Sequence, residues 1–318
     1  MLDAVMKTTS FILGQGSMYE RLRRSESIDL DPQIFHAGLV YGDQSRQVLA
    51  DTLREYLDIG QAHGLPMITT TPTWRANAER ISRSRHAGAK VNQDCAQFML
   101  DLREAYGVKE TQILIGGATG PKGDGYLPQE APSRDKAMEF HRPQIEALAE
   151  SGIDFLVAKT LPAFDEALGI ATCMAETNLP FVLSFVIRPD GTLLDGTLLE
   201  EAVDRIDNET TQPPTTYFVN CVHASVFAAG MELATLRNPE SVARVTGLDA
   251  NTSAKSPEEL DGLTEIDTEA PDDFGKNLWA LNAKLGTVYL GGCCGSSTEH
   301  IEALARRGIA EIRTIATP

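Results

Sequence analysis

The fold of this chain is indicated most clearly by one stretch, Thr287-Val288-Tyr289-Leu290-Gly291-Gly292-Cys293-Cys294-Gly295-Ser296-Ser297-Thr298-Glu299-His300-Ile301. An apolar strand over Thr287–Leu290 leads into a glycine-rich loop, and the loop leads into a helix. Ser296 and Glu299 have the spacing of a capping box, so the helix is expected to begin beside them. A strand, a loop and a helix in this order form the repeating unit of parallel α/β proteins.

The same unit recurs along the chain. Short apolar runs predict eight strands, at Ser10–Leu13, Pro66–Thr70, Gln112–Gly116, Phe155–Lys159, Phe181–Val186, Tyr217–Cys221, Ala243–Gly247 and Val288–Leu290. Stretches with helical spacing lie between most of them, as at Gln47–Gln61, Ala137–Ser151, Phe164–Glu176 and Phe274–Leu285. The alternation predicts an α/β fold, namely a single (β/α)8 TIM barrel domain over residues 1–318. A doubly wound open sheet is the alternative, because periodicity does not distinguish closed from open sheets.

Two connections are long enough to extend the loops at the C-terminal mouth of such a barrel. Arg24–Gly42 follows the first helix, and Asp249–Asp273 follows the seventh strand and is rich in acidic and hydroxyl residues. Long loops in compact domains either are simply solvated or border a functional site.

The composition excludes some partners. The 318 residues carry a formal net charge of −17, which disfavours binding to nucleic acid or to an anionic membrane surface. Met1–Ser10 lacks the apolar segment of a signal peptide, and no apolar run is long enough to span a bilayer. These features predict a cytoplasmic protein.

The cysteines point to a metal site. Cys293 and Cys294 lie in a strand-to-helix loop, and Cys221 ends the predicted sixth strand. In a parallel barrel both positions are at the mouth where active sites are built, and the glycines allow the loop to bend. Three thiolates suit Zn²⁺, and three protein ligands with an open position are typical of catalytic zinc.

Other interpretations of the cysteines stay open. Cys95 and Cys173 lie in helical stretches and are expected to fill the core. A disulfide between Cys293 and Cys294 would indicate a redox protein. His223, two residues after Cys221, could be a fourth ligand and make the zinc structural.

Taken together, the motifs resemble the homocysteine S-methyltransferase family. The Gly-Gly-Cys-Cys-Gly stretch and Asn220-Cys221 are similar to the zinc signatures of that family. Weaker similarities extend over almost the whole chain, at Ile12–Ser17, Thr71–Ala76, Gly120–Gly123, His141–Gln144, Gly152–Asp154, Ser184-Phe185 and Asp190-Gly191.

The resemblance implies a (β/α)8 barrel that transfers a methyl group to a small thiol, homocysteine or a relative, in methionine biosynthesis. Zinc deprotonates a bound thiol near neutral pH and so makes it a nucleophile. The donor must carry a good leaving group, as in a sulfonium, a betaine-type ammonium or a corrin-bound methyl. The donor is therefore expected to be a free small molecule or to be brought by a separate corrinoid protein, and the chain could form a homo-oligomer.

Two positions depart from the family pattern. Gly14 replaces an aspartate in the opening motif, and Lys159 replaces a glutamate after the fourth strand. In the family these acids lie near the amino group of homocysteine, so their loss favours a thiol that carries a carboxylate and lacks the amino group. The other interpretation is that Lys159 pairs with a local acid.

No catalytic side chain is expected beyond the three zinc ligands. The expected substrate-binding residues are those of the mouth motifs, namely Gly14, Gln15, Thr73, Trp74, Lys159 and Asn220. Trp74 could line a pocket for a cationic donor. The departures also leave open a zinc-binding barrel without catalytic turnover.

Overall fold

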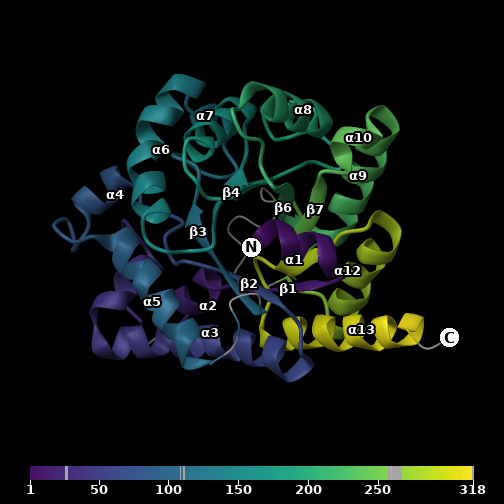
Figure 1. Ribbon diagram of the computed structural model, residues 1–318, viewed down its shortest axis with the longest axis horizontal. Helices are drawn as coiled ribbons and strands as arrows, with labels where there is room; N and C mark the ends of the chain where they lie inside the picture. The colour runs from purple at the N-terminus through teal and green to yellow at the C-terminus, as the bar shows by residue number, and fades with distance from the viewer. Residues whose placement is uncertain (26–27, 108, 110–111, 257–258, 260–266, 317–318) are drawn as a thin grey trace.

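The computed structural model describes residues 1–318 with the exception of 26–27, 108, 110–111, 257–258, 260–266 and 317–318. Eight parallel strands form a closed barrel in chain order, and β1 also pairs with β8. Helices surround the strands (Figure 1). The predicted (β/α)8 TIM barrel is confirmed, and the open-sheet alternative is wrong.

Each predicted strand is present, with shifted ends. The strands are β1 Ile12–Gly14, β2 Met67–Thr70, β3 Ile113–Thr119, β4 Phe155–Leu161, β5 Phe181–Phe185, β6 Thr216–His223, β7 Val245–Asn251 and β8 Tyr289–Gly292. Strands β3, β4, β6 and β7 continue beyond the apolar runs into polar residues. These polar ends lie at the mouth of the barrel. Their backbone groups are still hydrogen-bonded between strands, so the strands continue although the side chains are polar.

The helices of the described chain include all four that the sequence analysis singled out. The α-helices are α1 Leu2–Thr8, α2 Tyr19–Arg23, α3 Asp43–His63, α4 Ala78–Arg83, α5 Val91–Ala105, α6 Arg134–Ala149, α7 Phe164–Ala175, α8 Leu199–Glu209, α9 Ala224–Arg237, α10 Pro239–Val242, α12 Pro271–Leu285 and α13 Thr298–Ala316. Short 3₁₀ helices are η1 His36–Tyr41, inside the first long connection, and η3 Pro128–Glu130. The middle of the second long connection lies outside the described residues. No helix among the described residues is both long and apolar enough to cross a membrane.

Helix α1 closes the end of the barrel opposite the mouth. It directly precedes β1, and it lies across the centre of the barrel in Figure 1. Leu2 and Val5 of this helix are buried in one apolar cluster with inward side chains of the strands, among them Ile12, Phe155 and Phe218. The sequence analysis assigned no structure to this segment.

Aromatic rings inside the barrel are accommodated by glycines on neighbouring strands. A Cβ atom at Gly116 would lie 2.6 Å from the ring of Phe155, and one at Gly247 would lie 2.2 Å from the ring of Phe218. The Phe218 ring also stacks on Tyr289, with 4.5 Å between ring centroids. The interior is therefore filled by large aromatic side chains, each of which packs against a glycine on a neighbouring strand.

Gly247→Ala should destabilise the barrel because the added methyl group overlaps a buried ring that has no free space to enter. Overpacking of this kind costs about 1–3 kcal/mol. The free energy of unfolding from urea titration measures the loss. Gly88→Ala is the matched control, since its Cβ would meet nothing within 4 Å; an equal loss in both variants would contradict the packing argument.

Candidate metal centre and active site

The three cysteines predicted to bind zinc meet at the mouth of the barrel. Cys221 lies near the end of β6, and Cys293 and Cys294 directly follow β8. Their Sγ atoms all lie within 4.8 Å of one another. In this structure Cys221 and Cys293 are joined as a disulfide and Cys294 is a free thiol. The alternative of a disulfide between Cys293 and Cys294 is therefore not supported.

The backbone at Cys221 is irregular. The sequence analysis ended the sixth strand at this residue, but β6 continues to His223 with a register shift between Asn220 and Val222. Cys221 has a φ of 58°, and Thr160, near the end of β4, has a φ of 66°. Such angles are unfavourable for side chains with a Cβ, above all a β-branched one, and they persist only where the surroundings enforce them. The two residues touch, with 4.0 Å between Thr160 Oγ1 and Cys221 Sγ.

Asn220 enforces this local geometry. Its side-chain oxygen accepts hydrogen bonds from the Thr160 backbone N–H, at 2.8 Å, and from the Ser184 hydroxyl, at 2.7 Å. Its side-chain nitrogen lies 2.8 Å from Thr160 Oγ1 and 3.2 Å from Cys221 Sγ. The amide therefore connects β4, β5 and β6 and orients the sulfur, which is a positioning role for a residue that the sequence analysis proposed for the substrate.

Asn251, at the end of β7, joins the two segments that carry the cysteines. Its side-chain nitrogen donates to the Cys221 carbonyl at 2.9 Å, and its side-chain oxygen accepts from the Cys294 N–H at 3.1 Å. The Cys293 N–H donates to the Ala250 carbonyl at 2.7 Å. Strand β7 lies between β6 and β8, so it sets the distance between the two loops.

The glycines of the cysteine loop act mainly through close approach. Gly291 and Gly292 lie in β8, and a Cβ at Gly292 would be 2.3 Å from Ser296 Oγ. Only Gly295 in this loop has a left-handed backbone, with a φ of 82°. The expectation that the glycines bend the loop by unusual angles is thus wrong for Gly291 and Gly292, which instead leave room for neighbours.

The predicted capping box at Ser296 and Glu299 is wrong by one residue. Helix α13 begins at Thr298, and the backbone N–H of Ser297 donates to His300 Nδ1 at 3.2 Å. Ser296 is used elsewhere, because its hydroxyl donates to the Cys293 carbonyl and accepts from the Ser17 N–H. This pair of bonds holds the loop in place against the segment after β1.

His223 does not join the sulfur cluster. His223 is the N-cap residue of α9, and its Nδ1 atom accepts from the backbone N–H of Ser225 and contacts the Ser225 hydroxyl. Its Nε2 atom lies 3.3 Å from Glu269 Oε1. Among the described residues, the group of potential metal ligands at the mouth consists of the three cysteines and does not include His223. The possibility of His223 as a fourth ligand is therefore not supported by the geometry.

The trio of sulfurs fits zinc. With Zn–S bonds of about 2.3 Å, tetrahedral geometry puts sulfurs about 3.8 Å apart, within the observed spacing. Burial and the nearby Glu20 carboxylate raise the pKa of Cys294 to about 11. The thiol is then protonated at neutral pH without a metal, and metal binding must release that proton. Tyr126, from the loop after β3, lies beside the same sulfur.

Lys159 forms an ion pair across the interior of the barrel. Its Nζ atom lies 2.7 Å from Asp249 Oδ2, and these two side chains are 18% and 1% exposed. The other carboxylate oxygen accepts from the Tyr289 hydroxyl at 2.6 Å. Asp249 is in register with Asn220 and Gly291, so the pair lies next to the cysteine-bearing residues. The interpretation that Lys159 pairs with a local acid thus has a geometric basis.

The remaining predicted substrate residues are held by hydrogen bonds in the surrounding loops. Gln15 accepts from the Thr70 N–H through its side chain and from the Gly292 N–H through its carbonyl. Thr73 is fully buried, and its hydroxyl donates to the Ala118 carbonyl.

Trp74 lies beside the fourth strand. Its Nε1 donates to the Lys159 carbonyl at 3.1 Å, and the Arg75 guanidinium lies 4.3 Å from its ring centroid. Trp74 is half-buried and Arg75 is buried, and the bond of Trp74 holds the loop after β2 against the end of β4. A cationic donor would therefore compete with Arg75 for one face of this ring.

The sequence analysis missed three polar residues of the mouth. Asp249 and Asn251 alternate along the end of β7, and Tyr126 comes from a loop with no chemical motif. The alternation of polar side chains at the end of an apolar strand was a usable signal for the first two, because such residues point to one face.

Comparisons with known proteins agree with this geometry. The sequence model of one family, described as Homocysteine S-methyltransferase, matches residues 12–307. The chain belongs to the homocysteine S-methyltransferase family.

Among the relatives of this chain, the homocysteine S-methyltransferase YbgG of Bacillus subtilis is 28% identical over 207 residues, which cover 60% of each protein. The betaine–homocysteine S-methyltransferase 1 of Bos taurus is 24% identical over 313 residues, 92% of this chain and 71% of that protein. The metallated form of the Escherichia coli homocysteine methyltransferase MmuM superposes with a TM-score of 0.73 at 22% identity, covering 96% of this chain and 99% of that one. That last similarity concerns the fold alone.

Gly14, where the homocysteine S-methyltransferase family resemblance implies an aspartate, has no room for a side chain. A Cβ at this position would lie 2.6 Å from the Tyr289 hydroxyl oxygen and 2.7 Å from Gly291 Cα. The space that a carboxylate would need is filled by the hydroxyl that binds Asp249. The packing of Tyr289 and Gly291 around position 14 therefore leaves no space for an acidic side chain.

Asn251→Ala should destabilise the protein because it leaves the Cys221 carbonyl and the Cys294 N–H without their partner. An unsatisfied buried polar group costs about 1–3 kcal/mol. The free energy of unfolding in urea measures the effect. Asn208→Ala is the control, since that exposed amide donates to the Asp204 carbonyl one turn earlier in its own helix; a loss no larger than the control's would show that Asn251 does not join the segments.

Proposed function

We propose that this protein is a zinc-dependent S-methyltransferase that moves a methyl group from an activated donor to homocysteine or a related small thiol. The observation that carries the proposal is the convergence of Cys221, Cys293 and Cys294 within 4.8 Å at the mouth of the barrel. Membership of the homocysteine S-methyltransferase family supports the same chemistry. The curated relative YbgG is matched over only 60% of its length, so its activity is part of the proposal.

The three cysteines would hold the zinc and leave one position for the acceptor thiol. When bound, zinc supplies the deprotonation and activation of that thiol. The protein residues fix the geometry: Asn220 orients the sulfur of Cys221, and Asn251 holds both cysteine segments at their spacing. Catalysis would then depend on the in-line position of the thiol sulfur and the methyl group.

The donor is proposed to be a small molecule with a good leaving group. A sulfonium or betaine-type ammonium meets this requirement, and the similarity to a betaine–homocysteine S-methyltransferase supports this class. A methyl group on a separate corrinoid protein is the other source. Methionine biosynthesis, a cytoplasmic location, a single domain and a homo-oligomer also belong to the proposal.

The acceptor is proposed to be a thiol whose carboxylate, rather than amino group, contributes to binding. Lys159, where the family resemblance implies a glutamate, forms a pair of zero net charge with Asp249. Gly14 contributes no charge and its site cannot hold a carboxylate without moving Tyr289. An ammonium group would thus find less attraction here than in the family pattern.

Replacement of any one of the three cysteines by alanine should abolish stoichiometric zinc binding. The unmodified protein, purified under reducing conditions with zinc, should hold about one zinc per chain by elemental analysis. Cys173→Ala is the control, because that thiol is buried between helices. Zinc retained at full stoichiometry in Cys293→Ala would contradict the site. Stoichiometric zinc without methylated product for any thiol and donor would instead favour a non-catalytic zinc-binding barrel.

A matched pair of acceptors tests the substrate class. 4-Mercaptobutyrate is homocysteine without its amino group, and it should be methylated with kcat/KM at least equal to that of homocysteine. Lys159→Gln should lower kcat/KM for 4-mercaptobutyrate by about tenfold, as loss of a charged hydrogen bond predicts. A strong preference for homocysteine in the unmodified enzyme would remove the altered acceptor and leave the methyltransferase proposal intact.

A further inference from the structure

A pocket lies among loops of the mouth, and none of the cysteines belongs to its lining. It has a cavity volume of about 130 Å³ and is lined by side chains that include Glu79, Arg80, Arg83, Lys122 and Phe140. The lining residues before α6 come from segments that follow β1, β2 and β3, so the pocket lies on the same end of the barrel as the cysteine cluster. Its size suits a small anion or the ionised end of a larger ligand.

The charges in this pocket are not balanced. Glu79 pairs with Arg83 at 2.6 Å. Among the described residues, neither Arg80 nor Lys122 has a carboxylate oxygen within 4.0 Å; Arg80 donates to the Gln33 carbonyl, and Lys122 Nζ lies 5.0 Å from the Phe140 ring centroid. The pocket therefore holds two cations that have no ion-pair partner among the described residues.

A third cation adds to the same region. Arg75, which is 8% exposed, also has no ion-pair partner among the described carboxylates. Burial, with a further contribution from the charge of Arg80, lowers the pKa of Arg75 to about 10. Asp124 and Glu166 partly offset this repulsion, and an anion bound beside Arg80 would offset it further.

The loop that carries Lys122 is held firmly by buried groups. The Arg75 guanidinium donates to the carbonyls of Pro121 and Gly123 at 3.0 and 2.5 Å, on either side of Lys122. The Lys122 N–H donates to the Glu166 carboxylate at 2.7 Å, and that fully buried carboxylate also contacts His141. The backbone is thus fixed while the ammonium group stays unpaired, which is the arrangement of a preorganised binding site.

We infer that this pocket binds a small oxyanion, a carboxylate or a phosphate, between the Arg80 guanidinium and the Lys122 ammonium. Arginine presents a planar pair of donors that match the geometry of either oxyanion, and lysine adds a compact charge. The Phe140 ring gives the pocket an apolar wall for the carbon skeleton of such a ligand. The site is separate from the cysteines and does not require a metal.

Isothermal titration calorimetry with inorganic phosphate and with glutarate, at constant ionic strength set by chloride, tests the inference and distinguishes the two anions. Saturable binding of at least one is expected. Arg80→Gln and Lys122→Gln should each weaken it by about tenfold. Lys122 is exposed, so its replacement leaves the folded protein available for titration even if Arg80→Gln is unstable.

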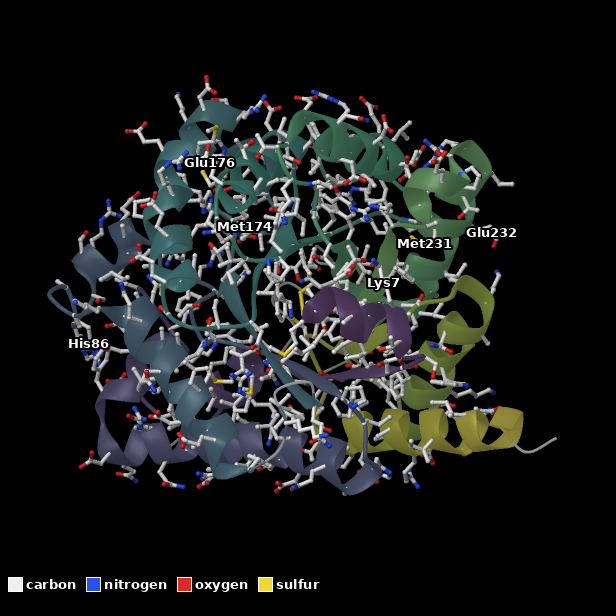
Figure 2. All side chains as sticks on the ribbon, in the orientation of Figure 1. Lys7, His86, Met174, Glu176, Met231 and Glu232 are labelled. Atoms are coloured by element: carbon white, nitrogen blue, oxygen red, sulfur yellow. A yellow bond between two sulfur atoms is a disulfide. The ribbon has the colours of Figure 1, made fainter. Side chains whose placement is uncertain are left out.

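Lys284→Gln is the charge-matched control. Lys284 pairs with Glu232 at 3.2 Å. Figure 2 labels Glu232 on α9 at one side of the molecule and His86, just beyond α4, at the other. The control should bind as the unmodified protein does. No saturable binding at millimolar anion, or equal weakening by Lys284→Gln and Lys122→Gln, would overturn the inference. Because binding is read without turnover, this result is independent of zinc content and methyl transfer.

Discussion

The side chain of Asn251 connects the two parts of the chain on which the proposed chemistry depends. One amide group binds the carbonyl of Cys221 and the N–H of Cys294, and so joins loops that are separated by most of two βα units. The barrel makes this possible because β7, which carries Asn251, is bonded on one side to β6 and on the other to β8. The position of the three sulfurs is therefore a property of strand order, refined by one side chain.

Unfavourable backbone angles also occur next to the cysteine cluster. Cys221 and Thr160 both have left-handed backbones, and Asn220 bonds to both of them. Unfavourable backbone angles at a site are retained when neighbouring groups over-determine them. Here they turn the sulfur of Cys221 toward the end of β8, which a regular strand would not do.

The strands and the cluster of three cysteines could be predicted from sequence because both have local signals. Apolar runs marked the strands, and a glycine-rich loop directly after a strand marked Cys293 and Cys294. The ion pair of Lys159 with Asp249 could not be predicted, since it joins β4 to β7 across the interior and depends on side-chain direction. The bulge at Cys221 and the packing role of Gly291 likewise depend on neighbouring strands rather than on nearby residues in the chain.

Helix α1 has a consequence for handling the protein. Because it seals the barrel at the end where the strands begin, Met1 lies on the face away from the cysteines, and Met1 is 45% exposed. An affinity tag or a reporter protein joined ahead of Met1 would extend into solvent from that face. Immobilisation through the N-terminus would then orient the barrel with its mouth toward the surrounding solution, open to thiols and donors.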